Sequence, residues 1–209
     1  PHRLLIYSED DSDAEGFGLI ARGLRHGRWT VPGVMAREAA AKMFASIWCS
    51  QTRARCREVM RQRIYELRQV KHPAYPPGRF EQATREHLEL VRQWARCFHG
   101  HIFKDDQQEI SVRAAEGVLM RGDMYLWIDG VPRAMAGRTR PTPHGWAVCQ
   151  VFTPAEHRRH GYATAVVASL SQRILDEGKQ FCTLYADLDN PASNRIYGRI
   201  GYRGVADVI

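Results

Sequence analysis

The chain has 209 residues, of which 44% are hydrophobic and 25% are charged, and this is the composition of an ordinary globular protein. The length suffices for one large domain, or for a domain with an added segment, and it allows a buried core. No apolar run approaches the length of a membrane span and no leader pattern opens the sequence, so we expect a cytoplasmic protein that does not bind membranes.

The net charge of +7 is unevenly spread along the chain. Twelve basic and three acidic residues lie between Arg22 and Lys71, and a strip of this kind attracts nucleic acids or acidic partners. The arginines from Arg53 to Arg68 are largely spaced by two, which also fits one solvated face of a strand. Because no recognition helix or aromatic platform accompanies them, we expect no nucleic-acid partner.

The five cysteines are Cys49, Cys56, Cys97, Cys149 and Cys182. They show no C-x-x-C pair and no dense, even spacing, so we expect reduced thiols. Two histidine pairs, His99 with His101 and His157 with His160, have no cysteine or carboxylate partners nearby in the sequence. We expect solvated surface histidines there, and no metal site.

The first part of the chain combines strand and helix patterns. Residues 3–7 (RLLIY) are an apolar run of strand length. Ser12 followed by Glu15 matches a capping box, so we expect a helix that opens there and ends at Gly27. A second helix is predicted over residues 36–48, with its apolar side chains on one side.

The clearest boundary in the sequence is Pro-Pro-Gly-Arg at residues 76–79, which divides the chain into segments 1–75 and 76–209. Just before it, residues 57–70 fit either a helix or a strand. The first segment is too short to sustain a core of its own. We therefore expect its apolar residues to be buried against each other and against the second segment; they are Leu4, Ile6, Phe44, Ile47 and Trp48.

A basic, glycine-containing turn lies between a strand pattern and a helix pattern in the second segment. Residues 146–152 (WAVCQVF) form an apolar run of strand length, and from Ala163 the apolar positions recur at helical spacing up to Gly178. The turn between them is RRHGYA at residues 158–163, in which Gly161 permits close backbone approach. The unpaired amides of the first helical turn favour an anion, so this arrangement predicts a pyrophosphate site.

A second motif follows the apolar run at residues 181–188 (FCTLYADL). Asn190, with Pro191 behind it, has the residue types of an N-cap and a first helical position, and Gly201 ends that helix. The pattern over residues 190–202 (NPASNRIYGRIGY) is N-x-x-S-x-x-x-Y-x-x-x-G-Y.

Together the two motifs resemble those of the GNAT superfamily of acyl-CoA-dependent N-acetyltransferases, over about residues 79–209. Arg158, Gly161 and Ala163 match the first motif, and Asn190, Ser193, Tyr197, Gly201 and Tyr202 match the second. Residues 1–75 resemble the N-terminal part of one bacterial subgroup, a degenerate half of the same fold. Such a segment is expected to cover a sheet edge and to shape a wall of the substrate site.

The resemblance implies an α+β fold, with a mixed sheet that carries helices on both faces and a smaller N-terminal α/β segment. It favours a strand within residues 57–70. A hairpin is expected at Asp129-Gly130. The other strands expected in the second segment are 79–83, 123–128, 132–140, 145–152, 181–187 and 202–208, and the helices are 84–98, 106–120, 159–177 and 191–200.

The family's co-substrate is acetyl-CoA, which lies between two diverging strands, by resemblance 145–152 and 181–187. Backbone groups would pair with the pantetheine as if with another strand, while the turn holds the pyrophosphate and an arginine adds charge. No metal is implied. The residues expected to bind the co-substrate are Val151, Phe152, Thr153, Arg158, Arg159, His160, Gly161, Tyr162, Ala163, Thr164, Asn190 and Ser193.

Tyr197 matches the family's usual general acid, which protonates the leaving coenzyme A thiolate. The alternative is a buried tyrosine that anchors its helix. The general base is open, because the strand before the turn contains no carboxylate. Glu116, Asp123, His144, Glu156 and a bound water are all conceivable bases, and Trp127 and Trp146 would either line the acceptor cavity or lie in the core.

The resemblance therefore predicts an enzyme that transfers an acetyl group from acetyl-CoA directly to a primary amine of a small molecule or a peptide. The alternative is a module that binds acyl-CoA without turnover, as a sensor or a structural partner. The sequence leaves the acceptor open, and it fits either a monomer or a homodimer.

Overall fold

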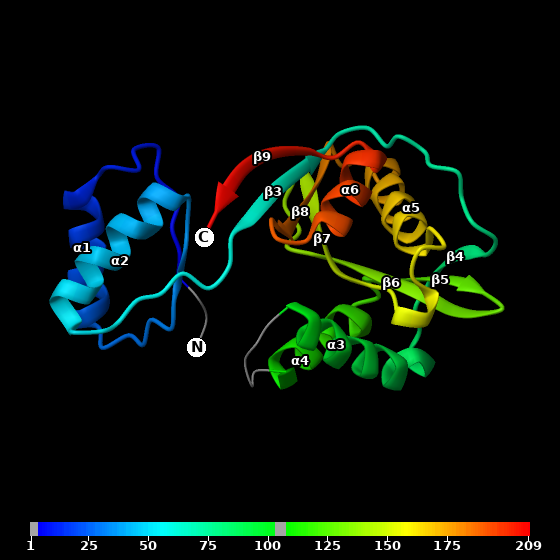
Figure 1. Ribbon diagram of the computed structural model, residues 1–209, viewed down its shortest axis with the longest axis horizontal. Helices are drawn as coiled ribbons and strands as arrows, with labels where there is room; N and C mark the ends of the chain where they lie inside the picture. The colour runs from blue at the N-terminus through cyan, green and yellow to red at the C-terminus, as the bar shows by residue number, and fades with distance from the viewer. Residues whose placement is uncertain (1–3, 103–107) are drawn as a thin grey trace. The chain divides into compact units, whose positions relative to one another are not determined.

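The computed structural model describes residues 4–102 and 108–209 (Figure 1). The chain forms two compact units. Unit 1 comprises Pro1–Ile64, Ala186–Pro191 and Gly204–Ile209, and unit 2 comprises Tyr65–Tyr185 and Ala192–Arg203. Unit 2 thus begins ahead of the proline-rich boundary at 76–79, and unit 1 includes two stretches from the C-terminal part of the chain. That residues 1–75 are a degenerate GNAT-like half stays a prediction.

Unit 1 packs two helices beside two short parallel strands. The helices are α1 (Ala14–His26) and α2 (Glu38–Thr52), and the strands are β1 (Leu4–Leu5) and β2 (Val34–Met35). The apolar residues expected to meet do so: Ile6 and Phe44 are buried, and Leu4, Ile47 and Trp48 pack against the same cluster. This cluster lies entirely among residues of unit 1, so the unit has a small core of its own.

The cap of α1 differs by one residue from the predicted capping box. The N-cap is Asp13, whose Oδ1 accepts a hydrogen bond from the amide of Gly16 at 2.8 Å. Ser12 instead donates through Oγ to Asp10 Oδ1 at 2.6 Å. Asp13 is the N-cap in place of Ser12 because a carboxylate is the stronger acceptor for the free amides of the first turn.

Cys49 and Cys56 form a disulfide, which corrects the expectation of five reduced thiols. Helix α2 ends at Arg53, whose left-handed φ of 58° turns the chain back on itself. This reversal brings the two Cα atoms to 6.8 Å, within the span that a disulfide bridges. Cys97, Cys149 and Cys182 are free thiols.

The main sheet has seven strands in the order β4-β5-β6-β7-β8-β3-β9. The strands are β3 (Gln62–Leu67), β4 (Arg79–Gln82), β5 (Met124–Asp129), β6 (Val131–Thr139), β7 (Gly145–Phe152), β8 (Phe181–Asp187) and β9 (Arg203–Val208). Strands β4 to β7 pair antiparallel, and β7 pairs parallel with β8. The sheet is therefore mixed, as predicted.

Strand β3 confirms the choice of a strand within residues 57–70. It lies between β8 and β9 in the sheet order, so it is an interior strand of the main sheet. The expectation was that residues 1–75 cover an edge of this sheet, and for β3 that expectation is wrong. Only Arg63 of the regularly spaced arginines belongs to the strand. The single solvated strand face expected for Arg53–Arg68 is therefore wrong for most of that stretch.

Four long helices belong to unit 2 or border it. They are α3 (Leu88–Ile102), α4 (Gln108–Met120), α5 (Tyr162–Asp176) and α6 (Pro191–Ile200), with single 3-10 turns at η1 (Arg85–His87) and η2 (Ala155–His157). Figure 1 shows α3 and α4 on one face of the sheet and α5 and α6 on the other. Within residues 4–102 and 108–209, none of the helices is long and apolar enough to cross a membrane.

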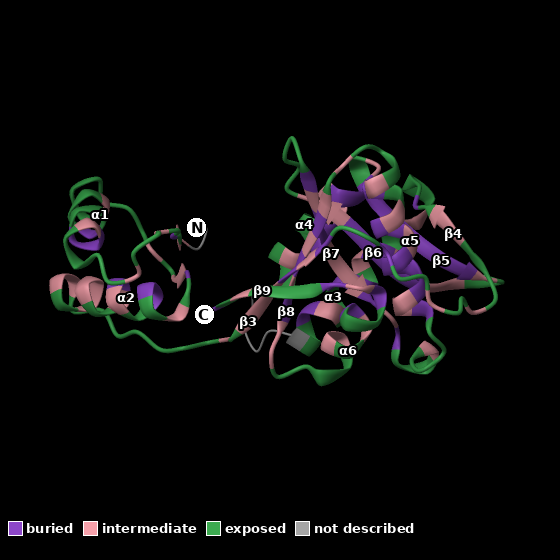
Figure 2. Ribbon diagram, turned by 90° about the horizontal axis from the view of Figure 1, so that it is seen from above, coloured by how far each residue is buried: buried purple, intermediate pink, exposed green. Residues whose placement is uncertain are grey.

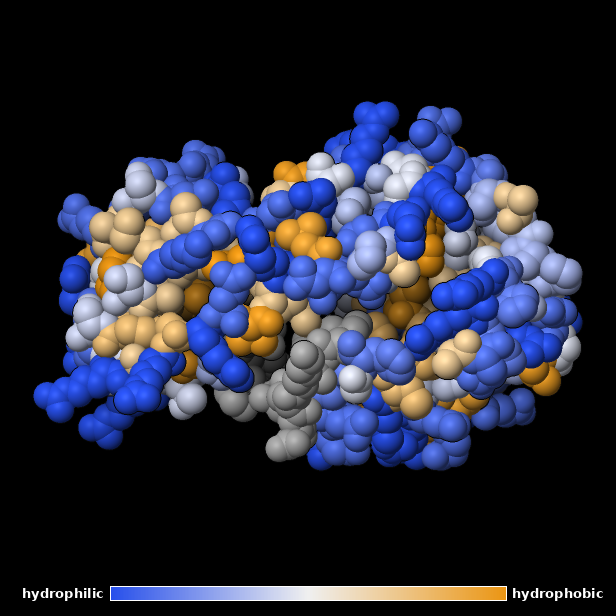
Figure 3. Space-filling model, viewed as in Figure 1, coloured by the Kyte–Doolittle hydropathy of each residue, from blue (hydrophilic) through white to orange (hydrophobic). Residues whose placement is uncertain are grey.

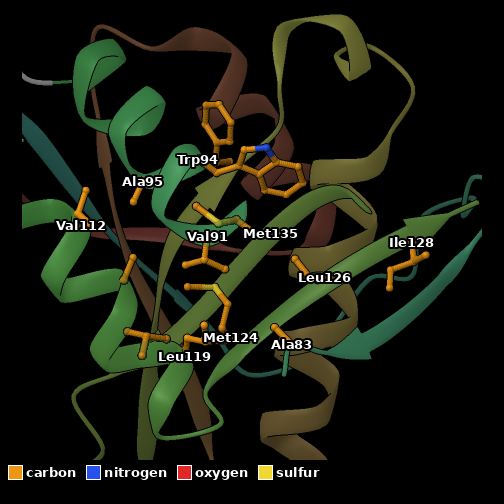
Figure 4. Close-up of a cluster of buried hydrophobic side chains, with 13 residues drawn as sticks. Ala83, Val91, Trp94, Ala95, Val112, Leu119, Met124, Leu126, Ile128 and Met135 are labelled. Atoms are coloured by element: carbon orange, nitrogen blue, oxygen red, sulfur yellow. The ribbon is translucent and has the colours of Figure 1, made fainter. Parts of the chain in front are cut away.

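The core of unit 2 lies between the sheet and the pair α3 and α4. Figure 4 shows Val91 and Trp94 of α3 facing Met124, Leu126 and Met135 of the sheet. On the other face, α5 buries its apolar side completely at Val166, Val167, Leu170 and Ile174. Figure 2 shows the buried residues gathered in β5, β6 and α5, whereas Figure 3 shows hydrophilic side chains over much of the surface in view.

Candidate functional site

Strands β7 and β8 separate after a short stretch of pairing. Their register covers Gly145–Ala147 against Phe181–Thr183, although both strands continue well beyond these residues. On its other side, β7 stays paired with β6 as far as Phe152. The edge of β7 that faces β8 therefore has backbone groups free to pair with an extended ligand. This divergence is the one that the sequence analysis expected between residues 145–152 and 181–187.

A bulge in β7 marks the divergent part of the strand. Gln150 has a φ of +52°, and the register with β6 shifts opposite it, between Met135 and Gly137. Two side-chain oxygens here, Gln150 Oε1 and Thr153 Oγ1, are buried without a hydrogen-bond partner among the described residues. Buried acceptors without partners are costly, so both atoms indicate a place for a polar ligand.

The predicted pyrophosphate turn has the backbone that anion binding requires. Gly161 is the N-cap of α5 with a φ of +85°, and its carbonyl accepts the amide of Ala165 at 2.9 Å. The amides ahead of Ala165 have no partner in the preceding turn of helix, so the helix dipole and these donors point toward the same place. A Cβ at position 161 would meet only Pro76 atoms at 3.8 and 3.9 Å, so the turn requires glycine for its φ and not for lack of space.

The predicted helix 159–177 begins later than expected, at Tyr162, because the positive φ values of Arg159 and Gly161 are incompatible with helix. Arg158 donates through Nε to the carbonyl of Thr153 at 3.2 Å, and its Nη2 lies 2.9 Å from His101 Nε2. Its guanidinium thus ties the turn to Thr153, directly after β7, and to α3. Arg159 is exposed and is the better placed of the two arginines for a phosphate.

The side chains of the other turn residues differ in what they can offer a ligand. Tyr162 is buried and donates through its hydroxyl to Asp129 Oδ2 at 2.7 Å, and Phe152 is part of the core cluster. Both side chains are occupied by contacts within the protein, so we expect their backbone groups to meet a ligand. His160 is exposed, with Nδ1 at 2.7 Å from the Arg158 carbonyl.

Tyr197 lies on α6 among two other tyrosines of unit 2. Its ring centroid is 6.0 Å from those of both Tyr65 and Tyr202. The hydroxyls of these neighbours are engaged, that of Tyr65 with Asn194 Oδ1 at 3.0 Å and that of Tyr202 with Ser171 Oγ at 2.8 Å. No hydrogen bond involves the Tyr197 hydroxyl within the described part of the chain. Burial, and secondarily the neighbouring Tyr65, raises the pKa of Tyr197 to about 12.

Asn190 and Ser193 lie at the start of α6, as the second motif predicts. Asn190 directly precedes the helix and is exposed, and its amide donates to the Asp187 carbonyl at 3.1 Å. Ser193 is half-buried in the first turn of the helix. That these two side chains contact the pantetheine stays a prediction. Sequence reasoning missed Asn194, whose contact with Tyr65 joins α6 to β3 and leaves no local signal in the sequence.

The structure separates the four candidates for the general base. Glu116 is ion-paired with Arg92, and Asp123 is paired with Arg138 Nε at 2.9 Å, so both carboxylates have arginine partners. His144 and Glu156 are exposed. The ion pairs make the first two poor candidates, because a proton acceptor would have to give up its arginine.

The expectations for the tryptophans and histidines are resolved in part. Trp127 is buried, stacks on Tyr75 at 5.8 Å and donates through Nε1 to the Pro77 carbonyl at 3.0 Å, so it belongs to the core. Trp146 is half-buried beneath Arg138, whose Cζ lies 4.6 Å from the ring centroid. His99 is buried, with Nδ1 at 2.7 Å from Ser111 Oγ, which corrects its expected place on the surface.

Metal ligands are not gathered anywhere in residues 4–102 and 108–209, where no group of three or more His, Cys, Asp or Glu side chains could hold an ion. The two strand cysteines in unit 2 are free thiols, Cys149 half-buried and Cys182 buried. Burial raises the pKa of both Cys149 and Cys182 to about 12, so neither is a thiolate at neutral pH.

Comparisons with known proteins agree with this geometry. A family model described as FR47-like protein matches residues 129–208, which include β6 to β9, the turn and α6. No curated protein matches the chain. An acetyltransferase of the GNAT family from Colwellia psychrerythraea has a similar structure, with 14% identity and a TM-score of 0.64 over 93% of this chain and 70% of its own.

Two GCN5-related N-acetyltransferases are similar as well. The protein from Kribbella flavida shares 19% identity with a TM-score of 0.59, over 95% of this chain and 74% of its own. The protein from Sphaerobacter thermophilus shares 15% identity with a TM-score of 0.63, over 94% of this chain and 67% of its own. Two further similar structures are longer, and this chain covers only 62% and 60% of them.

These structures share their fold with the chain across nearly its whole length, whereas the sequence match is confined to the part that carries both motifs. The divergence of β7 and β8, the turn at Gly161 and the helix with Tyr197 all lie within that matched part. The chain therefore has the fold of the GNAT-family acetyltransferases, and its residues 129–208 match the FR47-like family model.

Proposed function

We propose that the protein transfers an acetyl group from acetyl-CoA to a primary amine. The observation that carries this proposal is the open edge of β7 beside the turn at Gly161. An extended strand edge suits the amides of pantetheine, and a helix N-terminus with a left-handed glycine suits a pyrophosphate. Both belong to unit 2, and the strand leads directly into the turn.

The residues present fit such a donor. Backbone groups of Val151, Phe152 and Thr153 would pair with pantetheine, and Thr153 Oγ1 would gain a partner that it lacks among the described residues. The amides from Gly161 to Thr164 would receive the phosphates, with Arg159 adding positive charge. When bound, acetyl-CoA supplies an activated thioester.

The chain's own contribution to the transfer is positioning and one proton. The amine nitrogen forms a bond to the thioester carbonyl carbon, the carbon–sulfur bond breaks, and the sulfur takes the proton of the Tyr197 hydroxyl. The proton lost by the amine passes through water to the deprotonated Tyr197, so the net products are one amide and one thiol. With its pKa raised to about 12, Tyr197 stays protonated at neutral pH and is available as this acid.

The proposal is tested by measuring thiol release from acetyl-CoA in the presence of a panel of amines, with mass spectrometry of each amine. Amine-dependent thiol release together with an acetylated amine supports it. Binding of acetyl-CoA with no transfer to any class of amine would instead favour the alternative, a module that binds acyl-CoA as a sensor or structural partner.

A further inference from the structure

A cavity of about 400 Å³ opens beside the bulge of β7, on the face of the sheet that α4 covers. Its wall includes Arg113 of α4, Arg121 just after α4, Arg140 after β6, and Cys149 and Gln150 of β7. All of these belong to unit 2. The volume lies within the range of small-molecule sites, and β7 joins the cavity to the open edge proposed for the acyl donor.

The charged side chains that line this cavity are all arginines. Arg121 has a partner in Asp123 at 3.5 Å. Within residues 4–102 and 108–209, Arg113 and Arg140 form no ion pair, and Arg140 lies instead over the ring of Tyr185 at 5.5 Å. The cavity therefore carries positive charge that the protein does not neutralise, and guanidinium groups bind carboxylates with two parallel hydrogen bonds.

Gln150, which also lines the cavity, has an acceptor atom that lacks a hydrogen-bond donor. Gln150 Oε1 is buried and has no partner among the described residues, and the residue lies at the bulge of β7 with its positive φ. An amide oxygen accepts from N–H or O–H groups. Next to it, Cys149 is a neutral thiol whose pKa burial raises, so it does not oppose the arginines with a negative charge.

We propose that this cavity binds the acceptor, and that the acceptor is a small amine that carries a carboxylate. Its nitrogen donates to Gln150 Oε1 beside the open edge of β7, and its carboxylate pairs with Arg113 and Arg140. This assignment rests on the proposed acetyl transfer and adds the substrate class to it. A neutral or cationic amine leaves both arginines without a partner.

The test measures binding separately from turnover. N-acetylated ω-aminocarboxylates of increasing length, which have the form of the product, are titrated by calorimetry into the full chain in the presence of coenzyme A. Each is compared with its uncharged carboxamide and with a phosphonate of equal length. We expect one chain length at which the carboxylate binds roughly ten- to a hundredfold more tightly than the carboxamide, the range for losing charged hydrogen bonds.

Arg113→Gln and Arg140→Gln should each remove most of that preference, whereas Arg113→Lys should retain part of it. The matched control is Arg85→Gln, an exposed arginine outside the cavity, which should leave the preference unchanged. Equal binding of carboxylate and carboxamide, tighter binding of the phosphonate, or a preference that survives both glutamine variants would overturn the assignment.

The same data separate this inference from the proposed function. Carboxylate-selective binding that depends on both arginines, without acetylation of any amine, would support the cavity assignment and contradict the transferase. Acetylation of neutral amines as fast as of their carboxylate-bearing counterparts would support the transferase and contradict the cavity assignment.

Discussion

The Tyr197 hydroxyl differs from those of its two aromatic neighbours in having no hydrogen bond within the described part of the chain, although the residue is buried. A structural tyrosine in this position would be expected to share its hydroxyl with the protein, as Tyr65 and Tyr202 do. A tyrosine that protonates a leaving group needs a free hydroxyl. The unpaired hydroxyl of Tyr197 therefore favours a catalytic role for this residue over a role as an anchor of its helix.

We therefore predict that Tyr197→Phe retains coenzyme A binding and lowers turnover by about a hundred- to ten-thousandfold, the effect of losing a positioned general acid. Binding is measured by calorimetry and turnover by thiol release. Tyr65→Phe, which removes a neighbouring hydroxyl, should change turnover far less. Wild-type turnover in Tyr197→Phe would make this tyrosine an anchor of its helix.

Gly161 offers a second test at the residue scale, with a control for backbone strain. Asparagine and aspartate both tolerate a left-handed φ, but only aspartate adds a negative charge where the phosphates would lie. We predict that coenzyme A raises the melting temperature of the wild type, that Gly161→Asp abolishes this rise and that Gly161→Asn retains part of it. An undiminished rise in Gly161→Asp would remove the turn from the site.

At the scale of elements, the sequence predicted those whose signal is local. The strand at residues 145–152 and the helix after Asn190 agree with β7 and α6, because the apolar run, the capping residue and the terminal glycine lie within the element or directly beside it. The start of α5 was missed, since Arg159 adopts a left-handed φ under the restraint of its turn and not from its own preference. The Gln150 bulge has no mark in the sequence for the same reason.

Strand β3 depends even more on distant contacts. Its place between β8 and β9 is set by pairing with strands far along the chain, which periodicity does not reveal. The bridge between Cys49 and Cys56 was likewise missed, because it requires the reversal at Arg53. The arginine-lined cavity could not be predicted either, since α4, β6 and β7 contribute to it from separate parts of the sequence.

The position of β3 predicts how chains truncated at the N-terminus behave. A chain that begins at Gly78 lacks the strand between β8 and β9 and lacks Tyr65, the neighbour of Tyr197, so it should aggregate and lose coenzyme A binding. A chain that begins at Arg61 keeps the strand and should be more soluble. The check is light scattering together with the thermal shift by coenzyme A. A soluble Gly78 chain with wild-type stability would show that β3 is dispensable.

At the scale of the whole molecule, several thiols and phenols whose pKa is raised by burial couple stability to alkaline pH, and Tyr202 is one of them. Burial raises the pKa of Cys149 and Cys182 from 9.0 to about 12, and that of Tyr197 from 10.0 to about 12. The folded protein holds these protons more tightly than the unfolded chain does. The stability they contribute is therefore complete below pH 9 and is lost as the pH rises toward 12.

We predict that the free energy of unfolding falls between pH 9 and pH 11, by up to about 1.4 kcal/mol per pH unit for each group that titrates only on unfolding. Urea denaturation at a series of pH values measures this fall. Replacing both strand cysteines with alanine should delay its onset to about pH 10, where tyrosine titrates. An onset that stays at pH 9 in the double variant would assign the fall to other groups.

The central claim is that this protein moves an acetyl group to an amine, and the stoichiometry of transfer tests it most directly. The full chain is incubated with acetyl-CoA and an accepted amine, and free thiol and acetylated amine are measured in the same samples over time. We predict one thiol for each acetylated amine in the wild type, with both products slowed together in Tyr197→Phe. Thiol that accumulates without acetylated amine, or no thiol above the level without protein, would contradict the claim.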